Sequence, residues 1–217
     1  MKVLVACEES QTVCKAFRER GHNAFSCDIE PCSGGHPEWH IMQDVLPLLN
    51  GRCSFKTMDG IEHSIDGKWD LIIAHPPCDY MSKAGARWMF ANGKVNQDRL
   101  QKAMEAKKFF MQFYNADCDK IVIENPTPLK IVGLPKETQV IQPYMFGEPY
   151  SKRTLLWIKG LEPLKPTNIL TEYQPWMPSN TGAFSRGAGG SHGIAHDKKT
   201  AAKTFEGIAT AMAEQWG

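Results

Sequence analysis

Short apolar runs recur along the chain, and each ends at or beside a proline, a glycine or a charged residue. Runs of this length that are rich in Val, Ile and Leu are typical of buried strands. We predict strands at residues 2–7, 22–29, 40–45, 68–75, 119–126, 137–143 and 153–160.

Three other stretches place apolar residues at helical spacing. Residues 10–20 predict a helix with Ser10 as N-cap and Gly21 as its stop, and with an apolar face of Val13, Ala16 and Phe17. Residues 96–115 and 200–216 predict two more helices. The face of the 96–115 helix is predicted to comprise Leu100, Met104, the stem of Lys107, Phe110, Phe113 and Tyr114.

Strands that alternate with helices predict an α/β fold, a doubly wound and mostly parallel Rossmann-like sheet with helices on both faces. The length of 217 residues indicates a single domain over residues 1–217. Residues 160–200 are rich in Pro, Gly, Ser and Asn, so we expect a flexible, loop-rich segment there.

Composition narrows the class of protein. A net charge of +1 does not indicate a polyanionic partner, so any nucleic-acid contact must come from local basic patches. The apolar runs are far shorter than the roughly 18 residues of a membrane span, and the N-terminus reads as a strand, not a signal peptide. Seven dispersed cysteines in a chain of this length indicate free thiols in the cytoplasm.

Acidic residues follow the first three predicted strands. Ligands of doubly wound sheets bind beyond the carboxyl ends of the strands, where an acid after the second strand typically binds a ribose hydroxyl. Asp28 has this position, and Asp44 is placed to accept from an adenine amino group. The first turn, CEESQ, has no glycine and carries Glu8 and Glu9, which would repel phosphate but suit the ammonium of S-adenosylmethionine. The alternative is that both acids only favour the start of a helix.

The stretch WDLIIAHPPC ends a buried strand with two prolines and a cysteine. Pro76 and Pro77 stiffen the exit, so Cys78 is expected to face the ligand crevice as a nucleophile. Its activation needs a nearby cation, for which Lys83, Arg87 and His75 are candidates. The alternative is a cysteine that only packs.

The stretch IVIENP ends the next long strand. Glu124 is expected to be held protonated by burial and to donate to a pyrimidine ring nitrogen, while Asn125 and Pro126 fix the turn. The alternative is a structural acid in an ion pair.

These two stretches carry a family resemblance. HPPCDYMS resembles the Pro-Cys segment of the cytosine-C5 DNA methyltransferases, IENP resembles their Glu-Asn-Val segment, and FGEPYSKRTLLWIKG is similar to their arginine-bearing strand. The whole chain looks like the compact DNA cytosine methyltransferases of phages and mobile elements, which also carry GIA-x-AMA-x-QW at the C-terminus.

The resemblance implies a methyltransferase that uses S-adenosylmethionine and binds and methylates DNA. Cys78 would attack C6 of the pyrimidine, Glu124 would bind its N3 edge, and the basic pair Lys152 and Arg153 would complete the catalytic set. The cofactor site is expected to comprise Cys7, Glu8, Ser10, Asp28, Ile29, Asp44 and Pro76. Residues 79–99 would form a loop that closes over the site, with Trp88 and Phe90 stacking and basic residues touching phosphates.

The chain departs from the family in three places. The cofactor turn lacks glycine, the spacing in YSKRT differs from that of the paired arginines, and there is no large target-recognition domain. Gly182–Gly193, with Arg186 and His192, would be a minimal substitute. We therefore expect DNA or a pyrimidine nucleotide as partner and make no prediction of oligomeric state.

Several alternatives remain. In one alternative, the enzyme class is the same but the substrate is a free pyrimidine nucleotide or single-stranded nucleic acid. In another, the chain is a non-catalytic module that binds nucleic acid or cofactor. Amino-group methylation is disfavoured because His75 stands where that chemistry uses Asn or Asp. A zinc site at Cys27, Cys32, His36 and His40 is disfavoured by the prolines between them, so no metal is predicted, and a Ser–His–Asp hydrolase lacks its G-x-S-x-G segment.

Overall fold

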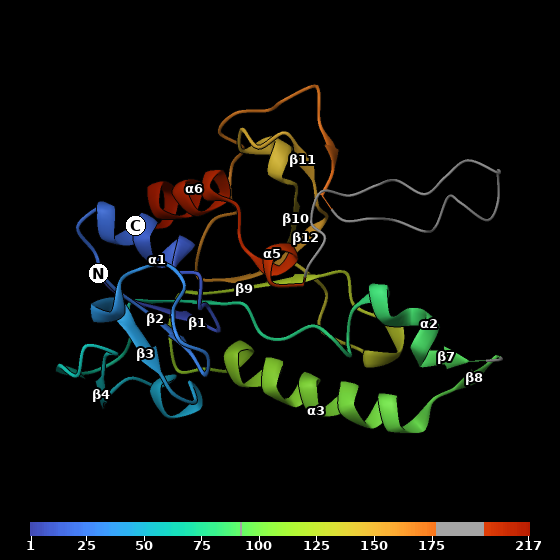
Figure 1. Cartoon of the computed structure of the whole chain (residues 1–217), viewed down its shortest axis with the longest axis horizontal. Helices are drawn as coiled ribbons and strands as arrows, with labels where there is room; N and C mark the ends of the chain where they lie inside the picture. The colour runs from blue at the N-terminus through green and yellow to red at the C-terminus, as the bar shows by residue number, and fades with distance from the viewer. Residues whose placement is uncertain (92, 177–197) are drawn as a thin grey trace.

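The fold is α/β, as predicted, with a seven-stranded and mostly parallel sheet at its centre (Figure 1). The structure is a computed structural model that describes residues 1–91, 93–176 and 198–217. The strands of the sheet are β1 Lys2–Ala6, β2 Asn23–Asp28, β3 His40–Met42, β6 Leu71–Ala74, β9 Ile121–Pro126, β10 Gln139–Ile141 and β12 Thr154–Lys159.

The order of the strands across the sheet is β10-β12-β9-β6-β1-β2-β3. The five strands from β3 to β9 are parallel to one another. Strand β12 runs antiparallel between β9 and β10. The start of β12 therefore lies beside the carboxyl end of β9, with Thr154 opposite Pro126.

Helices cover both faces of the sheet. Helices α1 (Thr12–Glu19) and α6 (Glu206–Trp216) lie on one face, and α3 (Gln97–Tyr114) lies on the other (Figure 1). Smaller elements connect them: η1 Pro37–Trp39, η2 Leu46–Leu48, β4 Cys53–Lys56, β5 Glu62–Ile65, η3 Lys83–Gly85, α2 Ala86–Met89, β7 Phe90–Ala91, β8 Lys94–Val95, η4 Lys130–Val132, η5 Pro143–Met145, β11 Tyr150–Ser151, β13 Gln174–Pro175 and α5 Lys198–Ala202.

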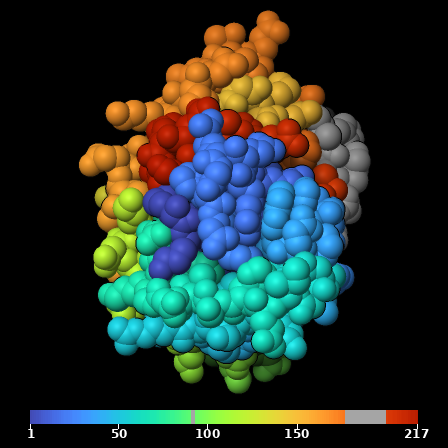
Figure 2. Space-filling view, turned by 90° about the vertical axis from the view of Figure 1, so that its left-hand side faces the viewer, coloured from blue at the N-terminus to red at the C-terminus, as the bar shows by residue number. Residues whose placement is uncertain are grey.

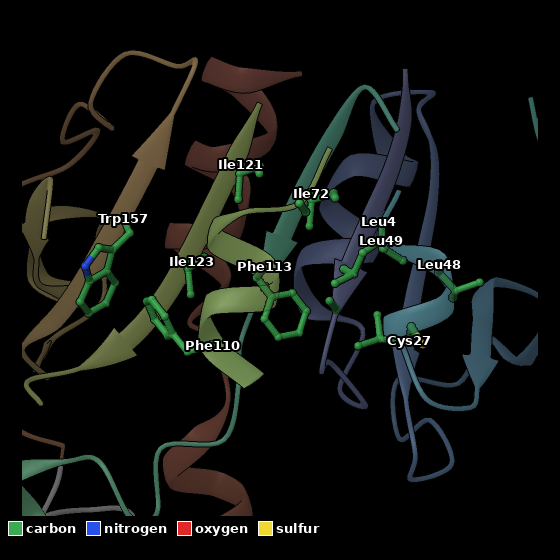
Figure 3. Close-up of a cluster of buried hydrophobic side chains, with 14 of the residues drawn as sticks. Leu4, Cys27, Leu48, Leu49, Ile72, Phe110, Phe113, Ile121, Ile123 and Trp157 are labelled. Carbon is green, nitrogen blue, oxygen red and sulfur yellow. The ribbon is translucent and has the colours of Figure 1, made fainter. Parts of the chain in front are cut away.

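Alternation along the strands divides the buried side chains into two cores. Ile121 and Ile123 of β9 pack on the α3 face with Phe110 and Phe113 (Figure 3). Val122, between them, packs on the face that α1 and α6 cover. Successive side chains of a strand point to opposite faces, so every second residue lies on the same face. This alternation also decides which polar residues just beyond each strand share a face.

The first and last helices are neighbours. Figure 2 shows α6 beside α1, on the side of the molecule that lies at the left of Figure 1. The backbone of α6 approaches its surroundings closely at Gly207, where a Cβ would lie within 2.1 Å of the carbonyl oxygen of Phe146. A glycine is needed at this contact because any side chain would move the helix.

Some local predictions are wrong. The helix predicted at 200–216 is divided into α5 and α6, with Lys203–Phe205 between them. The hairpin β4–β5 was not predicted, β3 ends at Met42 before Asp44, and Tyr114 is exposed on α3. Residues 177–197, with Arg186 and His192 of the predicted recognition element, lie outside the described residues. Within the described ranges, no helix is long and apolar enough to cross a membrane.

Candidate active site

The segment that follows β6 is a short extended exit that turns at Cys78. His75 continues the β6 ladder, donating its backbone N–H to the Ala6 carbonyl at 2.9 Å. After the two prolines, the Cys78 carbonyl accepts from the backbone N–H groups of Met81 and Ser82, at 3.0 and 2.9 Å. The thiol is half-buried and free, at the carboxyl end of a central strand as expected.

The exit of β9 is bound directly to this segment. Asn125, which is 4% exposed, donates from its side-chain amide to the Pro76 carbonyl at 2.8 Å. Further on, Lys83 donates its backbone N–H to the carbonyl of Thr127, and Leu129 donates to that of Met81. The chain on both sides of Cys78 is therefore bound to the segment that directly follows Glu124.

Glu124 and His75 form a buried pair on this edge. Ala74 is paired with Ile123 in the sheet, so the next residues of the two strands are neighbours on the face covered by α6. Their Nδ1 and Oε2 atoms are 3.0 Å apart, and the side chains are 14% and 11% exposed. Thr204, between α5 and α6, donates its hydroxyl to the same oxygen at 3.0 Å.

The charges in this pair differ from our expectation for Glu124. Burial alone raises the pKa of Glu124, but the hydrogen bond and charge of His75, with help from Lys152, lower it to about 2. Burial lowers the pKa of His75, but the hydrogen bond and charge of Glu124 outweigh it and the net pKa is raised. The carboxyl group is therefore ionised and paired with an imidazolium, and the prediction that burial keeps it protonated is wrong for this state of the protein.

Lys152 is the cation that acts on the thiol. It precedes β12, whose start lies beside the carboxyl end of β9, and it donates from Nζ to the Lys203 carbonyl at 3.3 Å. Burial raises the pKa of Cys78, as does Asp79, and Lys152 opposes them. The thiol is therefore neutral at rest, and the expectation that Lys83, Arg87 or His75 would lower its pKa is not met. Arg153, next to Lys152, is exposed.

The turn after β1 is strained and differs from our expectation. Cys7 and Gln11 have φ angles of 58° and 59°, in the left-handed region that favours glycine. Glu8, 5% exposed, accepts from the backbone N–H groups of Val13 and Cys14 at 2.6 and 3.2 Å. Glu8 therefore caps the first turn of α1 with both of its carboxylate oxygens. Ser10 is not the N-cap, because Gln11 holds that position without a side-chain bond.

The predicted nucleoside-binding residues gather at the ends of β2 and β3. The negative charges of Asp28 and Asp44, after burial, are causes of the raised pKa of Cys7, so all three residues are near one another. Asp28 accepts from the backbone of Glu30, and Asp44 accepts from that of Leu46, each through one oxygen at 3.0 Å. Ile29 is 74% exposed beside them.

A contact that was not predicted from the sequence holds the loop of residues 30–39 against this end of the site. The side chain of Gln11 donates to the His36 carbonyl at 2.8 Å and accepts from its backbone N–H at 3.0 Å. At Gly34 a Cβ would lie 2.5 Å from the Ser10 carbonyl oxygen. Residues 30–39 are thus seated against the CEESQ turn, and the glutamine in that turn is the one sequence signal for the contact.

The two histidines considered for zinc have other partners. His40 bonds to Ser26 through Nδ1 at 2.8 Å and to the Glu30 carbonyl through Nε2 at 3.0 Å. The ring of His36 contacts Glu38. Across the described part of the chain, no group of three or more His, Cys, Asp or Glu side chains is arranged to hold a metal ion.

A basic and aromatic pocket lies next to the segment that carries Cys78. Its volume is about 390 Å³, and it is lined by Tyr80, Arg87, Trp88, Asn96, Asp98, Arg99 and Lys102. The Arg99 guanidinium lies 5.1 and 5.5 Å from the ring centroids of Tyr80 and Trp88, and that of Arg87 lies 4.0 Å from Trp88. Arg99 also donates to the Asp79 carbonyl at 2.8 Å, which attaches the pocket to the residue after the thiol.

Comparisons with known proteins give a distant likeness. No protein-family model matches the chain, and no curated protein matches it. Among solved structures, the chain is similar to a mutant of DNMT2 from Spodoptera frugiperda, with 16% sequence identity and a TM-score of 0.37, over 83% of this chain and 56% of that chain. The chain thus spans little more than half the length of that protein, and a likeness at this level assigns no activity.

Proposed function

We propose that the protein is an S-adenosylmethionine-dependent C5 methyltransferase of pyrimidines, with cytosine in nucleic acid as its substrate. One observation carries the proposal. A thiol and a buried carboxyl group leave neighbouring parallel strands, and the Asn125–Pro76 hydrogen bond holds their two segments together. This is the pair of groups that addition to C6 and binding of the N3 edge require.

The chemistry assigned to the chain's own residues follows from this placement. Cys78 loses its proton to solvent and forms the S–C6 bond, while the ring electrons move toward N3, which takes a proton at the Glu124 edge. Lys152 stabilises the thiolate by its charge. After C5 has been methylated and has lost its proton, the S–C6 bond breaks, N3 gives its proton back, and the thiol is regenerated.

The residues at the ends of β1, β2 and β3 fit a nucleoside cofactor. Asp28 and Asp44 each accept a backbone hydrogen bond with one oxygen, which leaves the other oxygen for a ligand. The apolar side chain of Ile29 is exposed to solvent. S-adenosylmethionine, when bound, supplies the methyl group. We propose that Asp28 and Asp44 hold its ribose and adenine, that Ile29 packs against the adenine, and that Cys7, Ser10 and Pro76 line the remainder.

The basic and aromatic pocket supports a nucleic-acid partner over a free nucleotide. Aromatic faces bind bases by stacking, and arginine binds phosphates with its planar fork. Arg87, Arg99 and Lys102 supply the charge, and Trp88, which is 50% exposed, supplies a face. A strand whose target base reaches Cys78 would place a neighbouring nucleotide near Tyr80, two residues away and within about 7.6 Å between Cα atoms.

The proposal is tested by trapping. A fluorine at C5 cannot leave as a proton does, so 5-fluorocytosine in the substrate, together with S-adenosylmethionine, should leave a covalent complex with Cys78. Duplex DNA, single-stranded DNA and free deoxynucleotide are compared. The complex is expected with nucleic acid and absent in Cys78→Ser, while Cys53→Ser, a half-buried thiol on β4, keeps it.

Two results would overturn parts of this proposal. Undiminished methyl transfer by Cys78→Ser would exclude the thiol as nucleophile. A complex formed only with free nucleotide would show that the substrate is the nucleotide and not nucleic acid. In that case Trp88→Ala would leave the rate of trapping unchanged.

A non-catalytic binding module is the second candidate, and the neutral Cys78 thiol favours it. For this candidate, calorimetry would detect S-adenosylmethionine binding, but no covalent complex would form on any of the three substrates. The two candidates therefore give opposite results in the same trapping experiment.

A further inference from the structure

The imidazole of His75 is buried at the catalytic edge with only one of its nitrogens in use. Nδ1 is 3.0 Å from Glu124 Oε2, whereas Nε2 is buried and makes no hydrogen bond within the described residues. Buried polar atoms without a partner are rare and need an explanation. The geometry ties this ring to a single carboxyl group, and that carboxyl group is the one assigned to the pyrimidine.

The two carboxylate oxygens of Glu124 differ in their hydrogen bonds. Both bonds from described residues, from His75 and from Thr204, end on Oε2. Oε1 is the oxygen left for a ligand. The threonine hydroxyl orients the group but cannot supply a proton at neutral pH, whereas an imidazolium can.

We propose that His75 is the source of the proton that N3 of the pyrimidine takes, and that it acts through Glu124 as a positioning and proton-supplying residue. The inference rests on the proposed function. It also resolves the difference between the protonated carboxyl group that the chemistry needs and the carboxylate that the resting protein holds.

The transfer balances as follows. In the resting state, Nδ1–H is covalent and the carboxyl group is ionised. Entry of the base removes water from the carboxylate, the Nδ1–H bond breaks, and an O–H bond forms on Oε2 of Glu124. Rotation of the carboxyl group about its Cγ–Cδ bond then presents this O–H to N3. As the Cys78 sulfur bonds to C6, that O–H bond breaks and N3–H forms, which leaves His75 neutral. When the S–C6 bond breaks at the end of the reaction, the proton returns to His75 by the same route.

Charged groups on three elements face the ring and set its proton affinity. Glu124 on β9 and Glu8 after β1 favour the imidazolium, and Lys152 before β12 opposes it. The raised pKa of His75 therefore keeps the proton on the ring to a higher pH than in a free imidazole. Above that pKa the proton is absent, so the rate of adduct formation should fall on the alkaline side.

The test compares two variants that each remove one hydrogen bond to the same oxygen. His75→Gln removes the proton, and we expect trapping to slow by about 100-fold or more, the range of general acid catalysis, with loss of the alkaline limb of the pH profile. Thr204→Val removes only the hydroxyl and should keep that limb, with less than about a tenfold change in rate. Equal rates and profiles for His75→Gln and wild type would overturn the inference.

A measurement on the unaltered protein keeps the test independent of folding. The ring nitrogens of His75, followed by NMR, should titrate at the pH where the trapping rate at low substrate falls by half, because that rate reports on the free protein. A ring that keeps one protonation state through the fall would overturn the relay. Failure of Cys78→Ser to abolish trapping would instead overturn the proposed function, so the two failures are distinguishable.

Discussion

The hydrogen bond between Asn125 and Pro76 is the most direct place to test whether the two catalytic segments act as one unit. Among the described residues, Asn125 is the one whose side chain donates to the Pro76 carbonyl, so Asn125→Ala leaves this carbonyl buried without that partner. An unpaired buried polar group costs about 1–3 kcal/mol. For a chain of this size each kcal/mol lowers Tm by about 2–4 °C, so we expect a decrease of roughly 2–12 °C.

The effect on chemistry should exceed the effect on stability. A displacement of about 1 Å in a catalytic group can cost about 100-fold in rate, and the thiol segment would lose its contact with β9. We expect trapping by 5-fluorocytosine to slow by about 10- to 100-fold at a temperature where the variant is folded. Asn115→Ala, at the exposed end of α3, is the matched control and should change stability by less than about 0.5 kcal/mol. Trapping by Asn125→Ala at the wild-type rate would refute the idea that this bond aligns the site.

Three further predictions concern the surrounding residues. Glu8→Ala should lower stability by about 1–2 kcal/mol in denaturant titrations through loss of the α1 cap, with S-adenosylmethionine affinity unchanged by calorimetry; lost affinity at unchanged stability would contradict the capping role. Gly34→Ala should weaken cofactor binding by about tenfold or more because the new Cβ forces the 30–39 loop off the turn, whereas Ser33→Ala, next to it and exposed, should bind normally. Glu124→Gln should lower the free energy of unfolding by about 3 kcal/mol between about pH 4.5 and 6.5, because a fall of the pKa from 4.5 to about 2 is worth about 1.4 kcal/mol per unit. This loss should shrink as pH falls from 4.5 toward 2, and also as pH rises through the raised pKa of His75. A loss of stability that does not change with pH would contradict the ion pair.

The strands of the central sheet could be predicted from the sequence because apolar runs and their proline or acidic ends are local signals. Lys152 could also be expected at the site, but only from the family resemblance. Its position depends on β12 running antiparallel, so that the start of this strand meets the ends of the others. No local pattern in YSKRT specifies that direction.

The pairing of His75 with Glu124 could be predicted in part from the sequence. Each lies two residues beyond a valine or isoleucine that packs under α6, Ile73 in one strand and Val122 in the other, so parity places both on one face. What parity could not give is the break between α5 and α6 that brings Thr204 to the same carboxylate. The apolar spacing of residues 200–216 continues through that break, and the tertiary contact overrides it.

The candidate site draws its groups from positions 75, 78, 124, 152 and 204. Residue 204 directly precedes α6, which packs against α1 near the opposite end of the chain. Contacts so distant in sequence form late and slowly in folding, since long loops must close first. A partly folded molecule with β1 to β9 in place would already carry the sulfur but neither the lysine nor the threonine. Under the proposed function, the reaction therefore requires a molecule whose folding is complete.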